Sequence, residues 1–223
     1  GNGRWARDRG LPRHLGHREG MKSVRETIEG AVEAGVDVLT LFAFSTENWQ
    51  RPAHEVSALM GLLQRYARKE RDELKRQGVE VHVLGELERV DDRTRRAVET
   101  IIDGTRGGDA LRLNLMISYG GREEIIRSAQ ILAAQVASGE LSVEDLDEEA
   151  FRSTLFTADV PDPDLLIRTS GEYRISNFML WQLAYTELHI TPVLWPDFDR
   201  EDLFKAILDF QRRERRFGLV ESS

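Results

Sequence analysis

The sequence of 223 residues contains no cysteine. Disulfides, thiolate nucleophiles and cysteine-bound zinc sites are therefore excluded, and the composition is compatible with a reducing compartment such as the cytoplasm. Basic residues are also in deficit, because 31 Lys and Arg face 39 Asp and Glu, for a net charge of −8. This balance argues against a nucleic-acid partner, since a nucleic-acid binder needs a basic face to displace counterions.

Long apolar runs and several common catalytic signatures are missing as well. The longest apolar stretch lies within residues 36–44, far short of the ~20 residues that span a bilayer. No G-x-x-x-x-G-K-[ST] phosphate loop and no G-x-S-x-G elbow occur, which argues against a Walker-type NTPase and an α/β-hydrolase. His14 and His17 lack a carboxylate at metal-ligand spacing, so they do not predict a zinc site.

The remaining pattern alternates helices and strands. The continuous apolar run at 36–44 is typical of a strand buried on both faces, and further strands are predicted at 79–83, 111–117, 165–167 and 188–190. Helical spacing and capping signals predict helices between them, including one over 178–185 and a last one over 200–217. We therefore expect one α/β domain over residues 1–223, with a mostly parallel central sheet flanked by helices.

Polar residues cluster directly after three of these strands, at 45–49, 118–122 and 168–171. Ligands of parallel α/β sheets bind beyond these carboxyl ends. A fourth cluster, at 1–5, would complete the set if a strand precedes Gly1. Each cluster alone could be an ordinary turn, but four together favour a ligand site.

Basic side chains gather near the start of the chain. Residues 1–25 contain seven Lys and Arg against two Asp and Glu. A basic island in an acidic protein favours a small polyanion, with a solvated helix face as the alternative. Glycines beside Arg4 let backbone N–H groups approach phosphate oxygens, and Arg13 and His17 could close over the same anion.

Several long motifs resemble those of the cis-prenyltransferase family, and within it the bacterial undecaprenyl diphosphate synthases (isoprenyl transferases). They run in order through nearly the whole chain, at 1–6, 16–20, 44–49, 119–122, 162–172, 176–178, 194–198 and 215–218. The resemblance implies a cytoplasmic homodimer with a parallel-sheet fold, with peripheral membrane contact expected for product release. It also implies Mg²⁺-dependent condensation of isopentenyl diphosphate, in cis, onto an allylic diphosphate primer. Farnesyl diphosphate is the expected primer, and a long-chain polyprenyl diphosphate such as undecaprenyl diphosphate, the lipid carrier precursor for cell-wall synthesis, is the expected product.

The resemblance also implies a set of site residues. The group expected around the primer is Gly1, Asn2, Gly3, Arg4, Trp5, Arg13, His17 and Arg51. The group expected around the diphosphate of isopentenyl diphosphate is Arg168, Arg174 and Ser176. Asn48 is the expected catalytic residue, orienting a water or the substrate, with Ser45, Glu47 and Trp49 beside it. Glu187 would help to hold Mg²⁺, and Arg216 and Gly218 would reach the partner subunit's site.

The growing hydrocarbon needs an apolar tunnel, because each buried CH₂ contributes about 0.8 kcal/mol. The candidates for its walls and floor are Leu41, Ala43, Leu59, Leu62, Leu63 and Leu111. Ordinary core packing is the alternative for each of them separately.

The chain departs from the family pattern at its start. The family has an aspartate directly before the Gly-Asn-Gly-Arg-Trp stretch, as its central magnesium and catalytic carboxylate, and this sequence begins one residue later. We expect the full-length protein to carry that aspartate before Gly1, preceded by an apolar strand. The N-terminal strand of the fold is accordingly expected to be missing from this chain.

Three alternatives stay open. A non-catalytic subunit of a heteromeric prenyltransferase would keep the fold and lose catalytic groups, and the presence of Asn48, Arg168, Arg174 and Glu187 argues against it. A shorter-chain cis-prenyl diphosphate synthase would share every motif. An unrelated phosphate-binding module would not need the motifs at 44–49 and 168–176 together.

Overall fold

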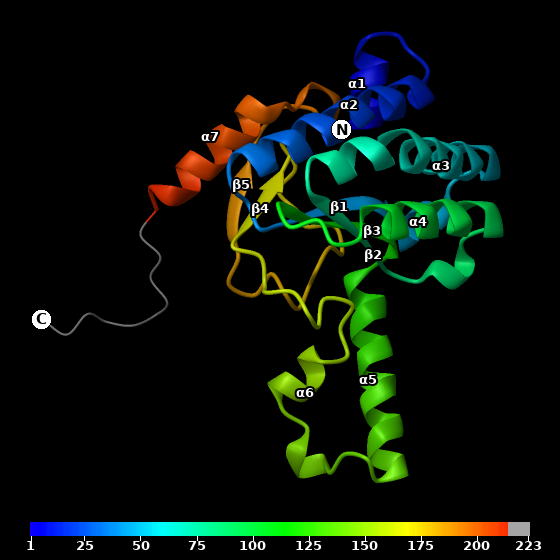
Figure 1. The fold of residues 1–223 in the computed structure, drawn as a ribbon, viewed down its shortest axis with the longest axis vertical. Coiled ribbons are helices and arrows are strands. Elements are labelled where there is room, and N and C mark those ends of the chain that lie inside the picture. The colour runs from blue at the N-terminus through cyan, green and yellow to red at the C-terminus, as the bar shows by residue number, and fades with distance from the viewer. Residues whose placement is uncertain (214–223) are drawn as a thin grey trace, which may run out of the picture.

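The computed structural model describes residues 1–213 (Figure 1). Its helices are α1 (Asn2–Asp8), α2 (Arg13–Glu33), α3 (Ala53–Arg76), α4 (Asp92–Thr105), α5 (Gly121–Ser138), α6 (Glu148–Arg152) and α7 (Arg200–Gln211). Its strands are β1 (Val38–Ser45), β2 (Val79–Leu84), β3 (Leu111–Tyr119), β4 (Leu165–Arg168) and β5 (Glu187–Ile190). The predicted final helix begins where expected, and its predicted end, like Arg216 and Gly218, lies outside the described residues.

All strand pairs are parallel, which confirms the predicted α/β fold. The strands form two sheets, one in the order β1-β3-β2 and one of β4 with β5. Within residues 1–213, β1 pairs along one edge with β3, and β4 pairs along one edge with β5. The other edges of β1 and β4 border the same cavity, as described below.

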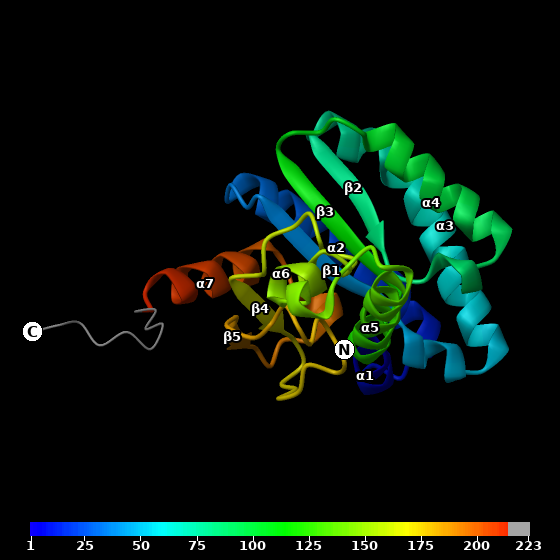
Figure 2. The same cartoon turned by 90° about the horizontal axis from the view of Figure 1, so that it is seen from below.

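The main core lies between the three-stranded sheet and its helices. Helices α3 and α4 lie together on one side of β2 and β3, while α7 lies by β4 and β5 (Figure 2). Strand β3 is buried along most of its length because it has a neighbour on each edge. The sequence offers Asp91 or Asp92 as the cap of α4, and in the structure it is Asp91, whose Oδ1 accepts from the Thr94 N–H at 3.0 Å. These contacts fix the strand ends that carry the polar loops.

The other face of β3 packs against a segment for which the sequence prediction was wrong. Residues 178–185 form a series of turns rather than a helix. Asn177 and Met179 have φ of +60° and +45°, which a right-handed helix does not accommodate. The Phe178 ring instead stacks on Phe42 with ring centroids 4.7 Å apart. Tertiary packing of an aromatic ring therefore overrides the local helical pattern.

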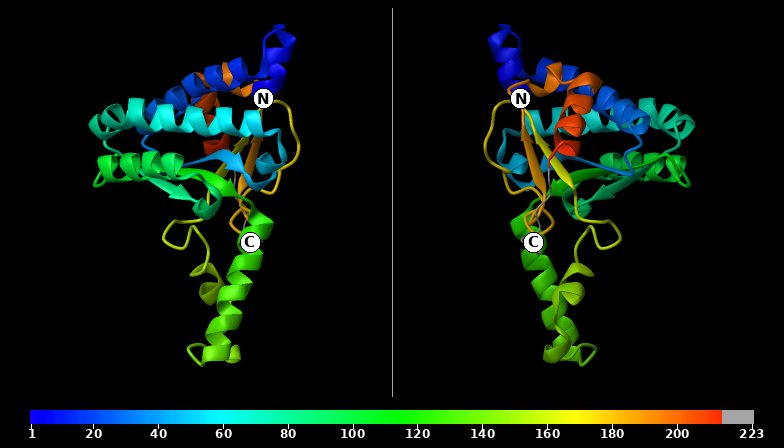
Figure 3. Two further views of the ribbon diagram at one scale, coloured as in Figure 1. Left: turned by 90° about the vertical axis from the view of Figure 1, so that its right-hand side faces the viewer. Right: turned by 90° about the vertical axis from the view of Figure 1, so that its left-hand side faces the viewer.

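Helix α5 projects away from the body as an arm, with α6 beside it, and α1 lies at the opposite end of the molecule (Figure 3). Ile126 on this arm is 60 % exposed. None of the helices in residues 1–213 is both long and apolar enough to cross a membrane.

Candidate functional site

The turn after β1, at Thr46–Gln50, is built by its own polar side chains. The Ser45 N–H donates to Asn48 Oδ1 at 3.1 Å, completing a capping box. Trp49 Nε1 donates to Ser118 Oγ at 3.0 Å, and its ring packs edge-on against Phe44. The loops that follow β1 and β3 are thus joined directly, as their positions at neighbouring strand ends predict.

A first group of charged side chains lies in the first two turns of α2 and around the start of α3, and we call it the helical cluster: Arg13, His17, Arg51 and Glu55. Arg51 Nη1 donates to Glu55 Oε1 at 2.9 Å, and Arg13 Nε lies 3.4 Å from the same oxygen. One carboxylate therefore holds two guanidinium groups. Gly3 lies beside them, because a Cβ on it would be 3.1 Å from Arg13 Nε.

His17 is a neutral member of this cluster. Asn2 Nδ2 donates to its Nδ1 at 3.1 Å, which leaves the ring proton on Nε2. Burial, together with the positive charges of Arg51 and Arg13, lowers the pKa of His17 to about 4. Its Nε2 is buried and has no hydrogen-bond partner. Such an unsatisfied donor beside two cations is suited to an anionic oxygen.

A second group lies on the loop after β4 and on α1, and we call it the loop cluster: Arg4, Arg168, Glu172, Arg174 and Ser176. Arg4 Nη1 donates to the Ser170 carbonyl at 2.8 Å, and both Arg4 and Arg174 pair with the Glu172 carboxylate. Arg4 was expected beside the primer. The structure places it here, in contact with Ser170 and Glu172, which lie 166 and 168 positions further along the chain.

Arg168 connects the loop cluster to the rest of the site. Its Nη2 donates to Ser176 Oγ at 3.3 Å. Burial and the nearby charge of Arg174 lower the pKa of the Arg168 guanidinium. Although burial alone would raise it, Arg174 and Arg4 hold the pKa of Glu172 below its ordinary value. Three arginines face one carboxylate in this cluster, so positive charge is in excess.

An apolar cavity of about 710 Å³ adjoins the clusters. Its volume lies in the range of ligand-binding pockets. Five of the six proposed tunnel residues line it: Leu41, Ala43, Leu59, Leu62 and Leu63. Ala43 is exposed although it lies within a strand, because its side chain borders this space. His17 and Arg168 line the same cavity, so hydrocarbon and anion sites are continuous.

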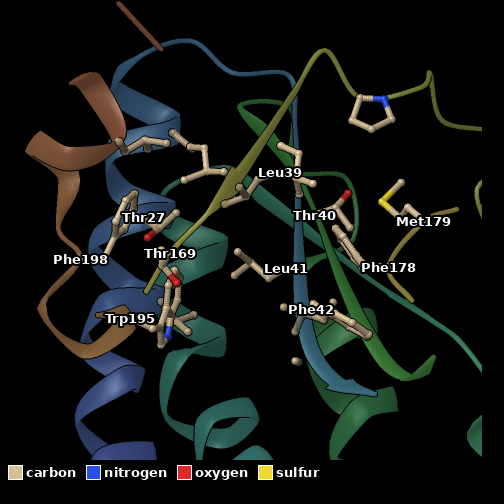
Figure 4. A pocket seen from close by; sticks show the side chains of 18 of the residues that line it. Thr27, Leu39, Thr40, Leu41, Phe42, Thr169, Phe178, Met179, Trp195 and Phe198 are labelled. Atoms are coloured by element: carbon tan, nitrogen blue, oxygen red, sulfur yellow. The ribbon is translucent and has the colours of Figure 1, made fainter. Parts of the chain in front are cut away.

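The cavity also runs along the open edge of β1. Figure 4 shows Leu39 and Leu41 on the side of the strand facing α2, and Thr40 and Phe42 on the other side. Residues of both orientations line the cavity, and so do those of β4. Because side chains from both faces of β1 and of β4 line the cavity, the cavity lies between the open edges of these two strands.

Two predicted residues are not brought to the site. Leu111 is 2 % exposed within the main core and is not among the residues that line the cavity, because it begins β3 at the end far from the loops. Glu187 begins β5, whereas Arg168 pairs with Ile190 at the other end. Glu187 Oε2 accepts from Arg213 Nη1 at 2.8 Å and lines neither of the two pockets.

Trp5 also points elsewhere than expected. Its Nε1 donates to Asp197 Oδ1 at 2.6 Å, and the Arg9 guanidinium lies over its ring. Within residues 1–213, no group of three His, Asp or Glu side chains could hold a metal ion, so these residues do not complete a magnesium site by themselves. The carboxylates of both clusters are already paired with arginine.

A second pocket, of about 860 Å³, lies on the loop-cluster side and is lined by Arg168, Arg174, Ser176 and Glu172. Glu55, Glu172 and Asn177 were not among the predicted site residues. Glu55 follows Arg51 by four residues, and the two side chains form an ion pair across the start of α3. No comparable signal marks Asn177, whose partners are distant in the chain.

The fold and the two arginine clusters at an apolar cavity define a protein that binds anions carrying hydrocarbon chains. The family model described as "Putative undecaprenyl diphosphate synthase" matches residues 1–218, and the chain belongs to this family of isoprenyl transferases. It is therefore an enzyme of cis-prenyl chain elongation.

Curated relatives match over nearly the whole chain. An isoprenyl transferase from Clostridium perfringens (strain 13 / Type A) is 47% identical over 221 residues, which is 99% of this chain and 87% of that protein. An isoprenyl transferase from Bacillus subtilis (strain 168) is 50% identical over 218 residues, 98% of this chain and 84% of that protein.

Two solved structures are similar as well. Lavandulyl diphosphate synthase from Lavandula x intermedia, in complex with dimethylallyl diphosphate, has a TM-score of 0.95 at 35% identity, covering 98% of this chain and 94% of that one. A probable undecaprenyl diphosphate synthase from Campylobacter jejuni has a TM-score of 0.79 at 35% identity, covering 91% and 93%.

Proposed function

We propose that the two clusters divide the two substrates of cis-prenyl chain elongation between them. The helical cluster binds the diphosphate of the allylic primer, and the loop cluster binds that of isopentenyl diphosphate. The observation that carries this assignment is the apolar cavity: His17 of the helical cluster lines it, whereas Arg174 and Ser176 line the other pocket. The primer carries the growing hydrocarbon and needs that cavity.

The chemistry follows from where charge develops. The allylic C–O bond breaks, the isopentenyl double bond forms the new C–C bond, and a proton then leaves. Negative charge builds on the departing diphosphate, where the Arg13 and Arg51 guanidinium groups and the His17 Nε2–H stabilise it. Arginine suits this role because its planar fork remains charged and meets phosphate at two points.

Asn48 is proposed to orient the reacting groups. Its Oδ1 is engaged by the Ser45 N–H, which fixes the amide plane. A neutral amide hardly accepts a proton, so we assign the proton to a diphosphate oxygen, with Asn48 holding a water or the substrate. Trp49 and Glu47, in the same turn, complete the wall beside it.

Magnesium remains a proposal based on the family. Since the described residues do not complete a metal site by themselves, we derive no step through the ion. The aspartate expected before Gly1 would lie close to the loop cluster, because a Cβ on Gly1 would be 3.3 Å from Ser170 Oγ. The open edges of β1 and β4 support the apolar strand expected before that aspartate. The space between α2, α3 and β1 would then serve the hydrocarbon.

We also propose a homodimer, as the resemblance to the family implies. Ile126 on the α5 arm is 60 % exposed, and Leu188 on the edge strand β5 is 49 % exposed. These two apolar side chains are candidates for contact with a partner subunit. Sedimentation of the wild type and of an Ile126→Glu variant tests this: a dimer converted to a monomer supports it, and a wild-type monomer contradicts it.

A shorter-chain synthase is the second candidate, favoured by the TM-score of 0.95 with lavandulyl diphosphate synthase. Incubation of the full-length protein with radiolabelled isopentenyl diphosphate, farnesyl diphosphate and Mg²⁺, followed by product chromatography, decides between them. A ladder ending in long-chain products supports our assignment. Products of one or two additions support the shorter-chain enzyme, and no condensation supports a non-catalytic subunit.

A further inference from the structure

Asn177 lies between the loops that follow β1, β3 and β4, and its backbone is unusual. Its φ is +60°, and that of the preceding Ser176 is +55°. Asparagine tolerates this left-handed region better than most residues, but serine does so less well. Two consecutive non-glycine residues with positive φ persist only where surrounding contacts hold them.

Those contacts are four hydrogen bonds across three segments. Asn177 Nδ2 donates to Glu47 Oε1 and to Glu123 Oε2, at 3.0 Å each. Its Oδ1 accepts from the Arg122 N–H at 2.9 Å, and its carbonyl accepts from the Gly121 N–H at 2.7 Å. The loop after β4 is thereby tied both to the turn that carries Asn48 and to the first turn of α5.

The surroundings leave little freedom at this junction. A Cβ on Gly120 would lie 2.8 Å from Asn177 Nδ2 and 2.2 Å from Glu123 Oε2, so a side chain there would displace both groups. A carboxamide NH₂ has two protons and can serve two carboxylates at once. An aspartate of the same shape would instead place a third negative charge between two others.

This junction connects the two sheets at the site. The strands of residues 1–213 form separate hydrogen-bonded sheets, and the loop cluster follows one while Asn48 follows the other. Ser176, a member of the loop cluster, is the direct neighbour of Asn177. A shift at Asn177 therefore moves Ser176 relative to Asn48.

We propose that Asn177 is a positioning residue that fixes the loop cluster, and with it the bound isopentenyl diphosphate, against the turn that carries Asn48. The inference rests on the proposed assignment of Arg168, Arg174 and Ser176 to that diphosphate. Asn177 itself touches no substrate in this role and acts through the two segments to which it is hydrogen-bonded, the turn that carries Asn48 and the first turn of α5.

The test is steady-state kinetics of the full-length enzyme with each substrate varied in turn. Asn177→Asp keeps the shape and the tolerance of positive φ but removes the donor. We expect kcat/KM for isopentenyl diphosphate to fall at least tenfold, while KM for the primer stays within twofold. Asn177→Gly removes the side chain, and glycine adopts positive φ without strain. This variant should show the same larger loss for isopentenyl diphosphate than for the primer. A purely structural loss would affect both substrates alike.

A rescue variant sharpens the test. Glu123→Gln alone keeps an acceptor oxygen for Asn177 and should change kcat/KM by less than threefold. In the Asn177→Asp background, the same Glu123→Gln change places an amide NH₂ on residue 123, which can donate to the carboxylate introduced at position 177. We expect it to raise kcat/KM for isopentenyl diphosphate at least threefold above that of Asn177→Asp, but not to the wild-type value, because the Glu47 carboxylate still faces the introduced carboxylate.

Several outcomes would overturn the inference. Unchanged kinetics in both Asn177 variants, equal losses for the two substrates, or failure of the rescue would each do so. Arg174→Ala is measured in parallel to separate the two proposals. If Arg174→Ala impairs use of isopentenyl diphosphate and the Asn177 variants do not, this inference alone fails. If use of isopentenyl diphosphate is unchanged in Arg174→Ala and in Arg168→Ala as well, the assignment of the loop cluster fails and this inference fails with it.

Discussion

Both arginine clusters surround one carboxylate, Glu55 in the helical cluster and Glu172 in the loop cluster. They differ in what supports them. Three of the four members of the helical cluster lie on the long helices α2 and α3, and one of them, His17, borders the apolar cavity. The loop cluster lies on a turn that contains residues with positive φ, among them Ser170 and Ser176. A rigid support suits the substrate that carries a long chain, and a loop held by hydrogen bonds suits a small substrate that enters anew in each cycle.

Arg168→Ala is expected to have the largest effect, because Arg168 lines both pockets. Loss of a charge-assisted contact costs about 1.5–3 kcal/mol, or roughly 10- to 150-fold in kcat/KM. Arg174→Ala, confined to the loop cluster, should mainly impair use of isopentenyl diphosphate. Kinetics with each substrate varied will show whether the clusters are distinct.

Arg168→Lys is the control for that experiment, since it keeps the charge and loses the planar fork. It should fall between the wild type and Arg168→Ala. An unchanged kcat/KM for isopentenyl diphosphate in both Arg168→Ala and Arg174→Ala would contradict the assignment of the loop cluster.

Ala43→Leu tests the hydrocarbon side of the comparison. Ala43 is small and borders the cavity, and added methylenes have little room in a packed wall. We expect the product distribution to shift to shorter chains, read by chromatography at equal turnover. Ala43→Ser, of nearly the same size, should leave the distribution as it is. The same product ladder from wild type and Ala43→Leu would show that Ala43 does not limit chain growth.

The sequence predicted the parallel α/β fold, a cap for α4 at Asp91 or Asp92 and the gathering of polar loops, because these depend on local spacing and on strand order. It did not predict the turns at 178–185, where stacking of Phe178 on Phe42 overrides a helical pattern. Nor did it place Arg4 in the loop cluster, since that contact joins α1 to the loop after β4. Long-range packing of this kind leaves no local signal in one sequence.

The pH dependence of stability should distinguish the clusters through His17. Its folded pKa of about 4 lies below the ordinary value of 6.5. Above pH 6.5 the ring is neutral in both states and contributes nothing. As pH falls from 6.5 toward 4, the unfolded chain takes up a proton that the folded chain does not, so the free energy of unfolding decreases. Between pH 7 and pH 5 this amounts to about 2 kcal/mol.

Urea unfolding of the wild type and of His17→Gln at these two pH values measures that contribution as a difference between variants. The variant should lose the part of the pH dependence that belongs to His17. His14→Gln, on the exposed side of the same helix, is the matched control and should follow the wild type. Parallel pH profiles for all three proteins would show that His17 is not held neutral by its surroundings.

The smallest effects are expected from the two carboxylates, Glu55 and Glu172. Each occupies its arginines while no diphosphate is bound, and an incoming diphosphate must displace it or share its partners. Glu172→Gln and Glu55→Gln should therefore strengthen binding of inorganic pyrophosphate by roughly two- to fivefold, because partly exposed pairs contribute up to about 1 kcal/mol. Both variants should also unfold at a lower temperature, since the remaining arginines repel one another. Calorimetric titration and thermal unfolding measure the two changes. Weaker pyrophosphate binding in either variant would mean instead that the carboxylate holds its arginines in the geometry that the diphosphate requires, and if only Glu172→Gln weakens binding, that requirement belongs to the loop and not to the helices.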